Sequence, residues 1–119
     1  MLAEMLSILG YQATVCNVPE RALELMDEQH FDLIISDFRM PGLNGEQFHR
    51  LVTQRHPPLA QRIIFLTGDL VNPETSNFLK NVSNPHLSKP FVLDNLKAKV
   101  AEVLLNNRVP YLPETVLLN

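Results

Sequence analysis

The sequence predicts an α/β fold in which a parallel sheet carries helices on both faces. Short apolar runs alternate along the chain with segments whose apolar residues repeat at helical spacing. The runs at 32–36 and 62–67 are rich in isoleucine and leucine and too short for buried helices, which is typical of strands buried on both faces. With 119 residues the chain forms one domain.

The N-terminal part begins with a helix over about residues 2–9, because leucines and methionine recur at helical spacing before Gly10. Alternating apolar and β-branched residues predict a strand at 11–16. Asn17 is interpreted as the start of the next helix, which ends near Gln29. These elements lead into the buried strand at 32–36.

Turn residues at 40–45 (MPGLNG) separate that strand from a helix over 46–56, which Pro57 and its neighbour stop. The second buried strand follows at 62–67. The first half of the chain therefore repeats the order strand, helix, strand.

The C-terminal part contains a short helix from Pro73 that ends before Asn84, then a short buried strand at 86–88. Residues 93–106 form the clearest amphipathic helix of the chain. The segment 109–119 holds two prolines and an apolar, β-prone end, and it lies outside the regular alternation.

Composition excludes several classes of function. A net charge of −3 without a run of basic residues predicts no nucleic-acid binding and no membrane contact. Cys16 is the single cysteine, so no internal disulfide is possible and the chain suits a reducing compartment. No apolar run is long enough to span a bilayer and no signal peptide is recognisable, so we expect a cytoplasmic location.

Three polar residues stand just beyond the ends of predicted parallel strands, namely Asp37, Thr67 and Lys89. Such ends meet at one edge of an open sheet, where ligands bind. Each residue has a plainer interpretation: Asp37 as a turn residue, Thr67 as a β-prone strand end, and Lys89 as a solvated side chain before a turn. Three such residues at three strand ends favour a shared site.

This set suits phosphoryl chemistry. The Asp37 carboxylate can attack phosphorus to form an aspartyl phosphate if the charge on the transferring group is neutralised. Thr67 can donate a hydrogen bond to one phosphoryl oxygen, and Lys89 can place a compact positive charge near another. Gly68 would let the backbone approach the ligand.

The stretches DLIISDFRMPGLNG, RIIFLTG and HLSKPF, in this order and spacing over residues 1 to about 106, resemble a receiver domain of bacterial two-component signalling. The resemblance implies a flavodoxin-like, doubly wound parallel sheet. It implies a response regulator domain, itself no enzyme, whose Asp37 takes a phosphoryl group from a phosphohistidine on a histidine kinase or a histidine phosphotransfer domain. The phrasing is most similar to receivers of hybrid sensor histidine kinases.

The same resemblance implies roles for the neighbours of Asp37. Thr67 and Lys89 would bind the phosphoryl oxygens, the bond before Pro90 would be cis, and the side chains of Arg39 and Asp69 would tune the phosphoryl lifetime. In the family the Arg39 position also supplies a backbone carbonyl to Mg²⁺, beside the Asp37 carboxylate.

The resemblance also implies a switch between Thr67 and the residue three before the lysine, His86. Phosphorylation would draw Thr67 toward the phosphate and let His86 turn inward, which would shift a protein-interaction surface on the last two helices. The alternative is a surface or partly buried histidine without a switching role.

The match fails at the start of the chain, because receivers carry a first strand that ends in an acidic pair, and both are absent here. We therefore expect Mg²⁺ to bind weakly or not at all to this chain, although the full-length domain would bind it. The expected fold is a truncated receiver over 1–108 that lacks its central strand and the start of its first helix, followed by the tail 109–119.

A missing central strand would leave backbone groups unpaired on two neighbouring strands. Thr115 to Leu118, from the tail or from a second molecule, is expected to insert there, which makes a domain-swapped or intertwined homodimer a prediction. The alternative is a tail that is disordered or packs elsewhere.

Two other functions compete with the phosphoacceptor. The absent acidic pair would favour a pseudo-receiver, a protein-interaction module that works without phosphorylation. An aspartate-nucleophile phosphatase is disfavoured, since such enzymes of the haloacid dehalogenase type place a second Asp where this chain has Arg39.

Overall fold

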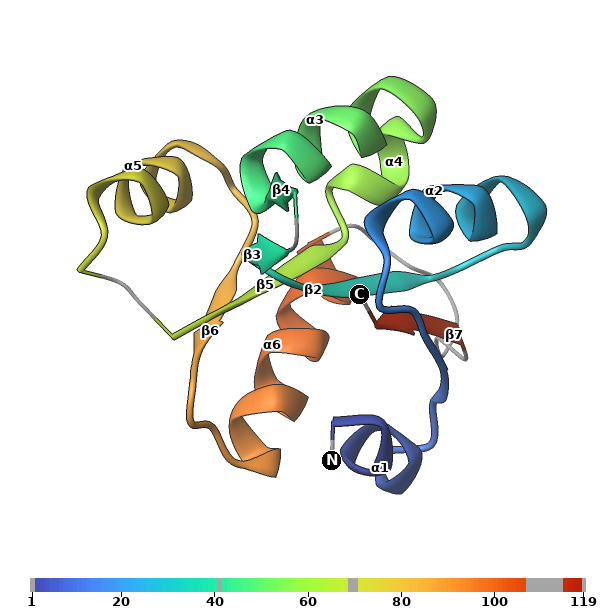
Figure 1. Ribbon diagram of the computed structural model, residues 1–119. Coiled ribbons are helices and arrows are strands. Elements are labelled where there is room, and N and C mark those ends of the chain that lie inside the picture. The colour runs from blue at the N-terminus through green and yellow to red at the C-terminus, as the bar shows by residue number, and fades with distance from the viewer. Residues whose placement is uncertain (1, 41, 69–70, 107–114, 119) are drawn as a thin grey trace.

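A computed structural model of the chain describes residues 2–40, 42–68, 71–106 and 115–118. It contains a parallel five-stranded sheet between two layers of helices (Figure 1). The elements in chain order are α1 (Leu2–Ile8), β1 (Gln12–Val15), α2 (Pro19–Glu28), β2 (Leu33–Asp37), β3 (Arg39–Met40), β4 (Leu43–Asn44), α3 (Gly45–Arg55), α4 (Pro57–Ala60), β5 (Ile63–Thr67), α5 (Pro73–Asn81), β6 (His86–Ser88), α6 (Leu93–Asn106) and β7 (Thr115–Leu118).

The strand order is β1-β7-β2-β5-β6, and every pair of neighbours is parallel. Helices α1 and α6 cover one face of the sheet, and α2 to α5 cover the other (Figure 1). The α/β fold with helices on both faces, predicted from the alternation of strands and helices, is therefore confirmed.

Successive residues of β2 face opposite cores, which is why Leu33–Ile35 is apolar without interruption. Leu33 and Ile35 pack with α1 and α6, whereas Ile34 packs with α2 and α3. Strand β7 follows the same rule: Val116 lies in the core formed with α1 and α6, and Leu117 lies in the core formed with α2 and α3. Both are fully buried.

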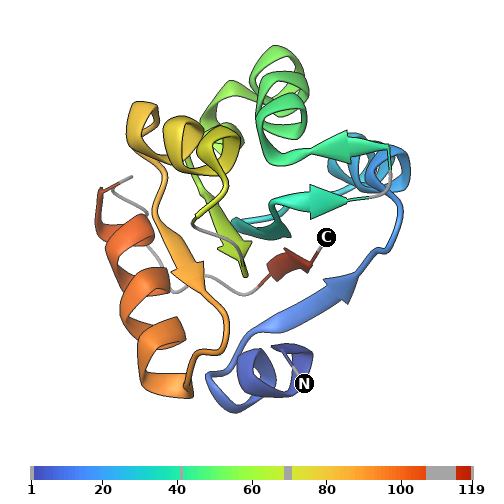
Figure 2. The same ribbon diagram turned by 60° about the vertical axis from the view of Figure 1, so that its left-hand side comes forward.

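Strand β7 lies inside the sheet, between the edge strand β1 and the central strand β2 (Figures 1 and 2). Thr115–Leu118 pairs with Gln12–Val15 on one side, and Val116–Leu118 pairs with Leu33–Ile35 on the other. The expected insertion thus occurs, with the strand coming from the same chain. The rest of the tail, 109–114 and 119, lies outside the described residues together with residues 107–108, and the expected homodimer stays a prediction.

Three local expectations are corrected. The N-cap of α2 is Val18, without a side-chain cap, because the residues before Pro19 stay extended and Asn17 lies one residue too early. Pro57 does not only end α3 but begins the short helix α4, since proline fits the first turn. Within the turn cluster, Arg39–Met40 and Leu43–Asn44 pair as a small antiparallel hairpin.

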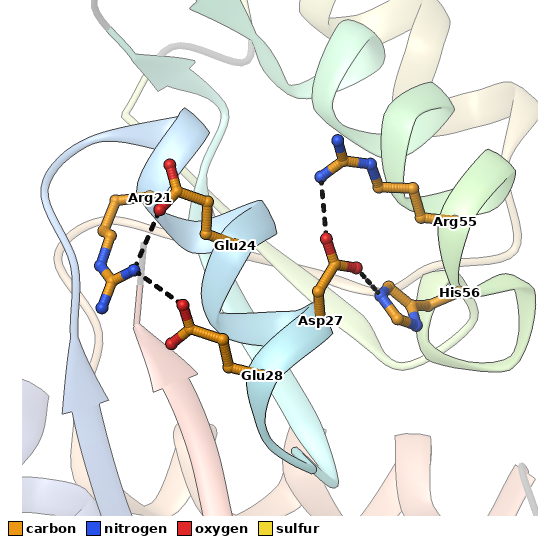
Figure 3. Close-up of polar contacts among 6 residues, drawn as sticks. All are labelled: Arg21, Glu24, Asp27, Glu28, Arg55 and His56. Carbon is orange, nitrogen blue, oxygen red and sulfur yellow. Dashed lines mark hydrogen bonds and ion pairs between the residues drawn. The ribbon is translucent and has the colours of Figure 1, made fainter.

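On the outer surface, α2 is tied to the end of α3 by polar contacts (Figure 3). The Asp27 carboxylate lies 3.4 Å from Arg55 Nη1 and 2.7 Å from His56 Nε2. These groups are largely exposed, so each pair contributes at most about 1 kcal/mol. They link the two helices at the surface and do not involve the sheet edge where Asp37 lies.

Candidate functional site

Asp37 ends β2 at the carboxyl edge of the sheet, half exposed. It stands opposite Leu66 of β5, and the next residue continues the ladder, because the Phe38 N–H donates to the Leu66 carbonyl at 2.9 Å. The strand therefore holds the Asp37 backbone on both sides of the residue, while the carboxylate projects beyond the buried part of β2.

Lys89 reaches this carboxylate from the end of β6. Its Nζ lies 2.6 Å from Asp37 Oδ1, and both side chains are about half exposed, at 48% and 43%. The Lys89 N–H donates to the Thr67 carbonyl at 2.8 Å, so the backbone of Lys89 is attached to the end of β5. The Lys89–Pro90 bond is cis, as the resemblance implied.

Thr67 ends β5 between these two residues and is 4% exposed. A cavity of about 220 Å³ opens at this point, and it is lined by Asp37, Phe38, Arg39, Leu66, Thr67, Gly68 and Lys89. The structure thus brings together the carboxylate, the hydroxyl residue and the ammonium that the sequence placed at three strand ends. The cavity has room for a small anion beside a cationic group.

Phe38, next to Asp37, anchors the loop that follows β2, and sequence reasoning missed this residue. Its ring is 2% exposed and packs against Phe65 and Phe78, with centroid distances of 6.2 and 5.5 Å. Gly45 admits the ring, because a Cβ at that position would lie 2.5 Å from Phe38 Cδ2. The Gly45 N–H also donates to the Phe38 carbonyl at 2.6 Å.

The other residues expected near Asp37 differ in where they lie. Arg39 and Gly68 line the cavity, whereas Pro90 lines a separate cavity of about 390 Å³ that Asp37 and Lys89 also border. A Cβ at Gly68 would meet no atom within 4 Å, so its protein surroundings do not require glycine there. Asp69 lies outside the described residues.

The proposed switch pair lies on adjacent strands. Thr67 is the register partner of Ser88, and His86 is the partner of Phe65, so Thr67 and His86 are two positions apart along the β5–β6 ladder. His86 is partly buried, and this desolvation, together with the positive charge of Lys99, lowers its pKa. The neutral imidazole is therefore favoured. This is compatible with a switch residue that turns inward and also with a histidine that has no switching role.

The other flank of Asp37 is apolar. A cavity of about 250 Å³ adjoins the carboxylate there and is lined by Leu2, Ala3, Val15, Cys16, Asn17, Ile35, Asp37, Leu66 and Leu118. Leu118, at the end of β7, brings no oxygen ligand to this wall by its side chain. This agrees with the expected insertion of Thr115–Leu118 in place of the missing strand.

The donors among the described residues offer a Mg²⁺ ion one carboxylate, which supports weak binding at most. This hard cation requires near-octahedral oxygen ligands, usually with one or two carboxylates. Asp37 is the single carboxylate among the described residues that line the three cavities around it, and it already pairs with Lys89. Within the described ranges no group of three His, Cys, Asp or Glu side chains could hold a metal ion.

Comparisons with known proteins identify the family of the chain. The response regulator receiver domain family matches residues 1–101. The chain is 31% identical to the sensor histidine kinase RcsC of Escherichia coli K12 over 82% of its own length and 10% of the kinase. It is 30% identical to a probable chemotaxis protein CheY of Rhizobium etli, over 87% of this chain and 81% of that protein.

Among solved structures, the fold is similar to the receiver domain of the sensor histidine kinase PA1611 from Pseudomonas aeruginosa, with a TM-score of 0.74 and 28% identity. The match covers 87% of this chain and 84% of that one, whose active site cleft coordinates a magnesium ion.

No helix in the described part of this chain is long and apolar enough to cross a membrane.

Proposed function

The chain belongs to the response regulator receiver domain family of two-component signalling, and we propose that it accepts a phosphoryl group on Asp37 from a phosphohistidine. The observation that carries this proposal is the ion pair of 2.6 Å between Lys89 Nζ and Asp37 Oδ1 at the mouth of a cavity. It joins the nucleophile to the cation that the transferred group needs.

In the proposed step, one Asp37 carboxylate oxygen forms a bond to phosphorus while the bond from phosphorus to the imidazole nitrogen breaks. The imidazole keeps the electron pair of that bond and takes up a proton. Lys89 neutralises charge on the phosphoryl oxygens, and Thr67 donates a hydrogen bond to one of them. Positioning and electrostatics supply the catalysis, as in phosphoryl transfer generally.

The donor would be a histidine kinase or a histidine phosphotransfer domain, in the cytoplasm. The chain spans only about a tenth of the length of the E. coli sensor kinase, so a parent hybrid kinase is part of the proposal. We expect Mg²⁺ to bind weakly, because the described donors include one carboxylate. Arg39 and Asp69 are proposed to tune the phosphoryl lifetime.

We also propose that His86 and Thr67 form the switch. Their spacing on adjacent strands supports this assignment. Exchange of His86 for alanine should leave the rate of Asp37 phosphorylation within about twofold and reduce the phosphorylation-dependent change on α5 and α6. Amide hydrogen exchange with and without the phosphoryl group measures that change; an equal response in both proteins would contradict the switch.

A pseudo-receiver is the second candidate function. It is favoured by the apolar wall of Leu118, Ile35 and Leu66 beside Asp37, where further metal ligands would be useful. A pseudo-receiver would bind a partner protein through the surface beside Asp37 whether or not Asp37 is phosphorylated.

The deciding experiment combines intact mass measurement with two donors, acetyl phosphate and a phosphorylated histidine phosphotransfer domain, in the presence of Mg²⁺. The wild-type chain should gain the mass of one phosphoryl group, and Asp37→Asn should gain none. Circular dichroism of both proteins verifies folding. If the folded wild type gains no phosphoryl group from either donor, the phosphoacceptor proposal fails and the pseudo-receiver replaces it.

A further inference from the structure

Asn44 lies where three segments of the molecule meet. It ends the β3–β4 hairpin that follows Asp37, and it is also the N-cap of α3. Its side-chain amide reaches α5 as well, because Asn44 Nδ2 donates to Glu74 Oε1 at 2.6 Å. One side chain therefore joins the hairpin beside the candidate site to the helix that comes after β5.

The other hydrogen bonds of Asn44 fix the orientation of its amide. The Gln47 N–H donates to Asn44 Oδ1 at 2.9 Å, and the Asn44 N–H donates to Gln47 Oε1 at 3.0 Å. An ionised carboxylate only accepts hydrogen bonds, so the amide NH₂ must face Glu74 and the amide oxygen must face α3. Aspartate would cap α3 equally well, but it has no donor for Glu74. The contact with α5 is therefore specific to asparagine among the usual acidic and amide N-caps.

The hairpin carries this connection to the candidate site. Arg39 is the register partner of Asn44, and Arg39 lines the cavity of about 220 Å³ that Asp37 and Lys89 also line. A pair of strands as short as β3 and β4 has little stability of its own. The position of Arg39 at the cavity therefore depends on the contacts that hold the two ends of the hairpin.

A second contact between the same segments lies in the core. The Phe38 ring, just before the hairpin, lies 5.5 Å from the Phe78 ring of α5. Glu74 and Phe78 are four positions apart in α5, so they lie on the same face of the helix. Helix α5 is thus attached at both ends of the hairpin, by an apolar contact at Phe38 and by a charge-assisted hydrogen bond at Asn44.

We propose that Asn44 is a positioning residue for the phosphoacceptor site, and that its hydrogen bond with Glu74 couples the hairpin beside Asp37 to α5. A movement of the hairpin on phosphorylation would then reach α5 directly, beside the route through Thr67 and His86. The kinetic part rests on the phosphoryl acceptance proposed above, whereas the coupling is a property of the unmodified protein.

The chemistry of this pair allows the hydrogen bond to be broken and restored. Asn44→Asp keeps an N-cap oxygen but removes the donor, and it adds a negative charge. Glu74→Ala removes the acceptor together with a negative charge. Glu74→Gln keeps an acceptor. When Asn44→Asp and Glu74→Gln are combined, the new amide can donate to the new carboxylate, so the double variant has the original net charge with donor and acceptor reversed.

The coupling is tested first in the unmodified protein, by heteronuclear NMR of the backbone amides. Glu74→Ala should shift the amide signal of Arg39 in the hairpin as well as the signals of its own helical turn. Lys80→Ala, at an exposed position in the last turn of α5, is the matched control and should leave the Arg39 signal unchanged. If Glu74→Ala shifts only signals of α5, the coupling is overturned.

The positioning role is tested by the rate of Asp37 phosphorylation from a phosphorylated histidine phosphotransfer domain. Asn44→Asp and Glu74→Ala change the local charge in opposite directions, yet both should lower the rate about fivefold, the usual effect of one lost hydrogen bond. Glu74→Gln and the double variant should stay within about twofold of the wild type. Rates that follow the charge of the pair, or a double variant as slow as Asn44→Asp, would overturn the positioning role.

Denaturant unfolding separates positioning from instability. The rates are compared under conditions in which every variant is fully folded, where a loss of stability alone does not lower the rate. A wild type that takes no phosphoryl group from the donor would overturn the proposed function and the positioning role of Asn44 with it. The amide signals would still decide the coupling of the hairpin to α5, so the two failures are distinguishable.

Discussion

The two flanks of Asp37 are built in different ways. On one flank β5 and β6 follow in chain order, and their ends bring Thr67 and Lys89 to the carboxylate. On the other flank β1 reaches the sheet only through β7, whose residues come from 115–118, and the cavity wall there is mainly aliphatic. The strands of the polar flank follow one another in chain order, whereas the apolar flank depends on a strand from the end of the chain.

This difference indicates that chemistry and architecture can be separated in the molecule. Changes on the β5–β6 flank should alter phosphoryl acceptance more than folding. Changes on the β1–β7 flank should alter folding first, because β7, three of whose four residues are buried, pairs with both β1 and β2.

The largest effect is expected from Leu117→Ala, which removes a fully buried side chain from the centre of β7. The free energy of unfolding should fall by about 3 kcal/mol, the usual cost of such a cavity. Denaturant unfolding measures it. Leu105→Ala, at a position 79% exposed, is the matched control and should stay within about 0.5 kcal/mol. Equal effects of the two changes would show that β7 does not support the sheet.

Lys89→Ala tests the opposite flank. The rate of Asp37 phosphorylation by a phosphorylated phosphotransfer domain should fall about 10²-fold, as when one charge-stabilising group is lost, equivalent to about 2.7 kcal/mol. Stability should change little, since the ion pair is half exposed. Lys80→Ala, at an exposed position of α5, is the control. A Lys89→Ala protein as fast as this control would remove Lys89 from the site.

Gly45→Ala probes the ring that anchors the loop after Asp37. The new Cβ would meet the Phe38 ring at 2.5 Å, and we expect a loss of about 1–2 kcal/mol in unfolding free energy. Gly68→Ala adds a methyl group that meets nothing within 4 Å, and its stability should stay within about 0.5 kcal/mol. Thermal unfolding of the two variants compares them; a Gly45→Ala protein as stable as the wild type would mean that Phe38 moves freely.

The smallest effects concern the pH dependence of stability. Histidines beside β5 and β6 should act at acidic pH, and Tyr11 beside β1 should act at alkaline pH. Desolvation lowers the pKa of His49, with a smaller opposing effect of a hydrogen bond with Asn84, and it also lowers the pKa of His86. The unfolded chain then binds protons first, so stability should fall as pH drops through about 6.5. Desolvation raises the pKa of Tyr11 beside β1, so stability should fall as pH rises through about 10.

Denaturant midpoints between pH 5 and 11 measure both slopes. His49→Phe keeps a ring against Phe65 and Phe78 and should weaken the acidic slope, whereas Tyr11→Phe should weaken the alkaline one. Each variant serves as the control of the other. If Tyr11→Phe changed the acidic slope, the two flanks would not titrate separately.

Much of the fold could be predicted because its signals are local. The runs predicted as strands at 32–36 and 62–67 are apolar because successive residues of β2 and β5 face opposite helical layers. The convergence of Asp37, Thr67 and Lys89 follows from one rule, that parallel strands end at the same edge. Asn17 failed as a helix cap because capping depends on a single residue position and Pro19 sets the start of α2.

From the sequence alone, the alternation of strands and helices, the three polar groups at one sheet edge and the absence of the acidic pair of the receiver pattern could be predicted. The structure added that Thr115–Leu118 fills the predicted gap from its own chain, between β1 and β2, in a register to which Asp32 and Cys16 contribute hydrogen bonds. It also showed that Gly45 makes room for the ring of Phe38, which packs against Phe65 and Phe78. Strand pairing and ring packing join residues far apart in the chain, whereas periodicity and turn chemistry report only on neighbours.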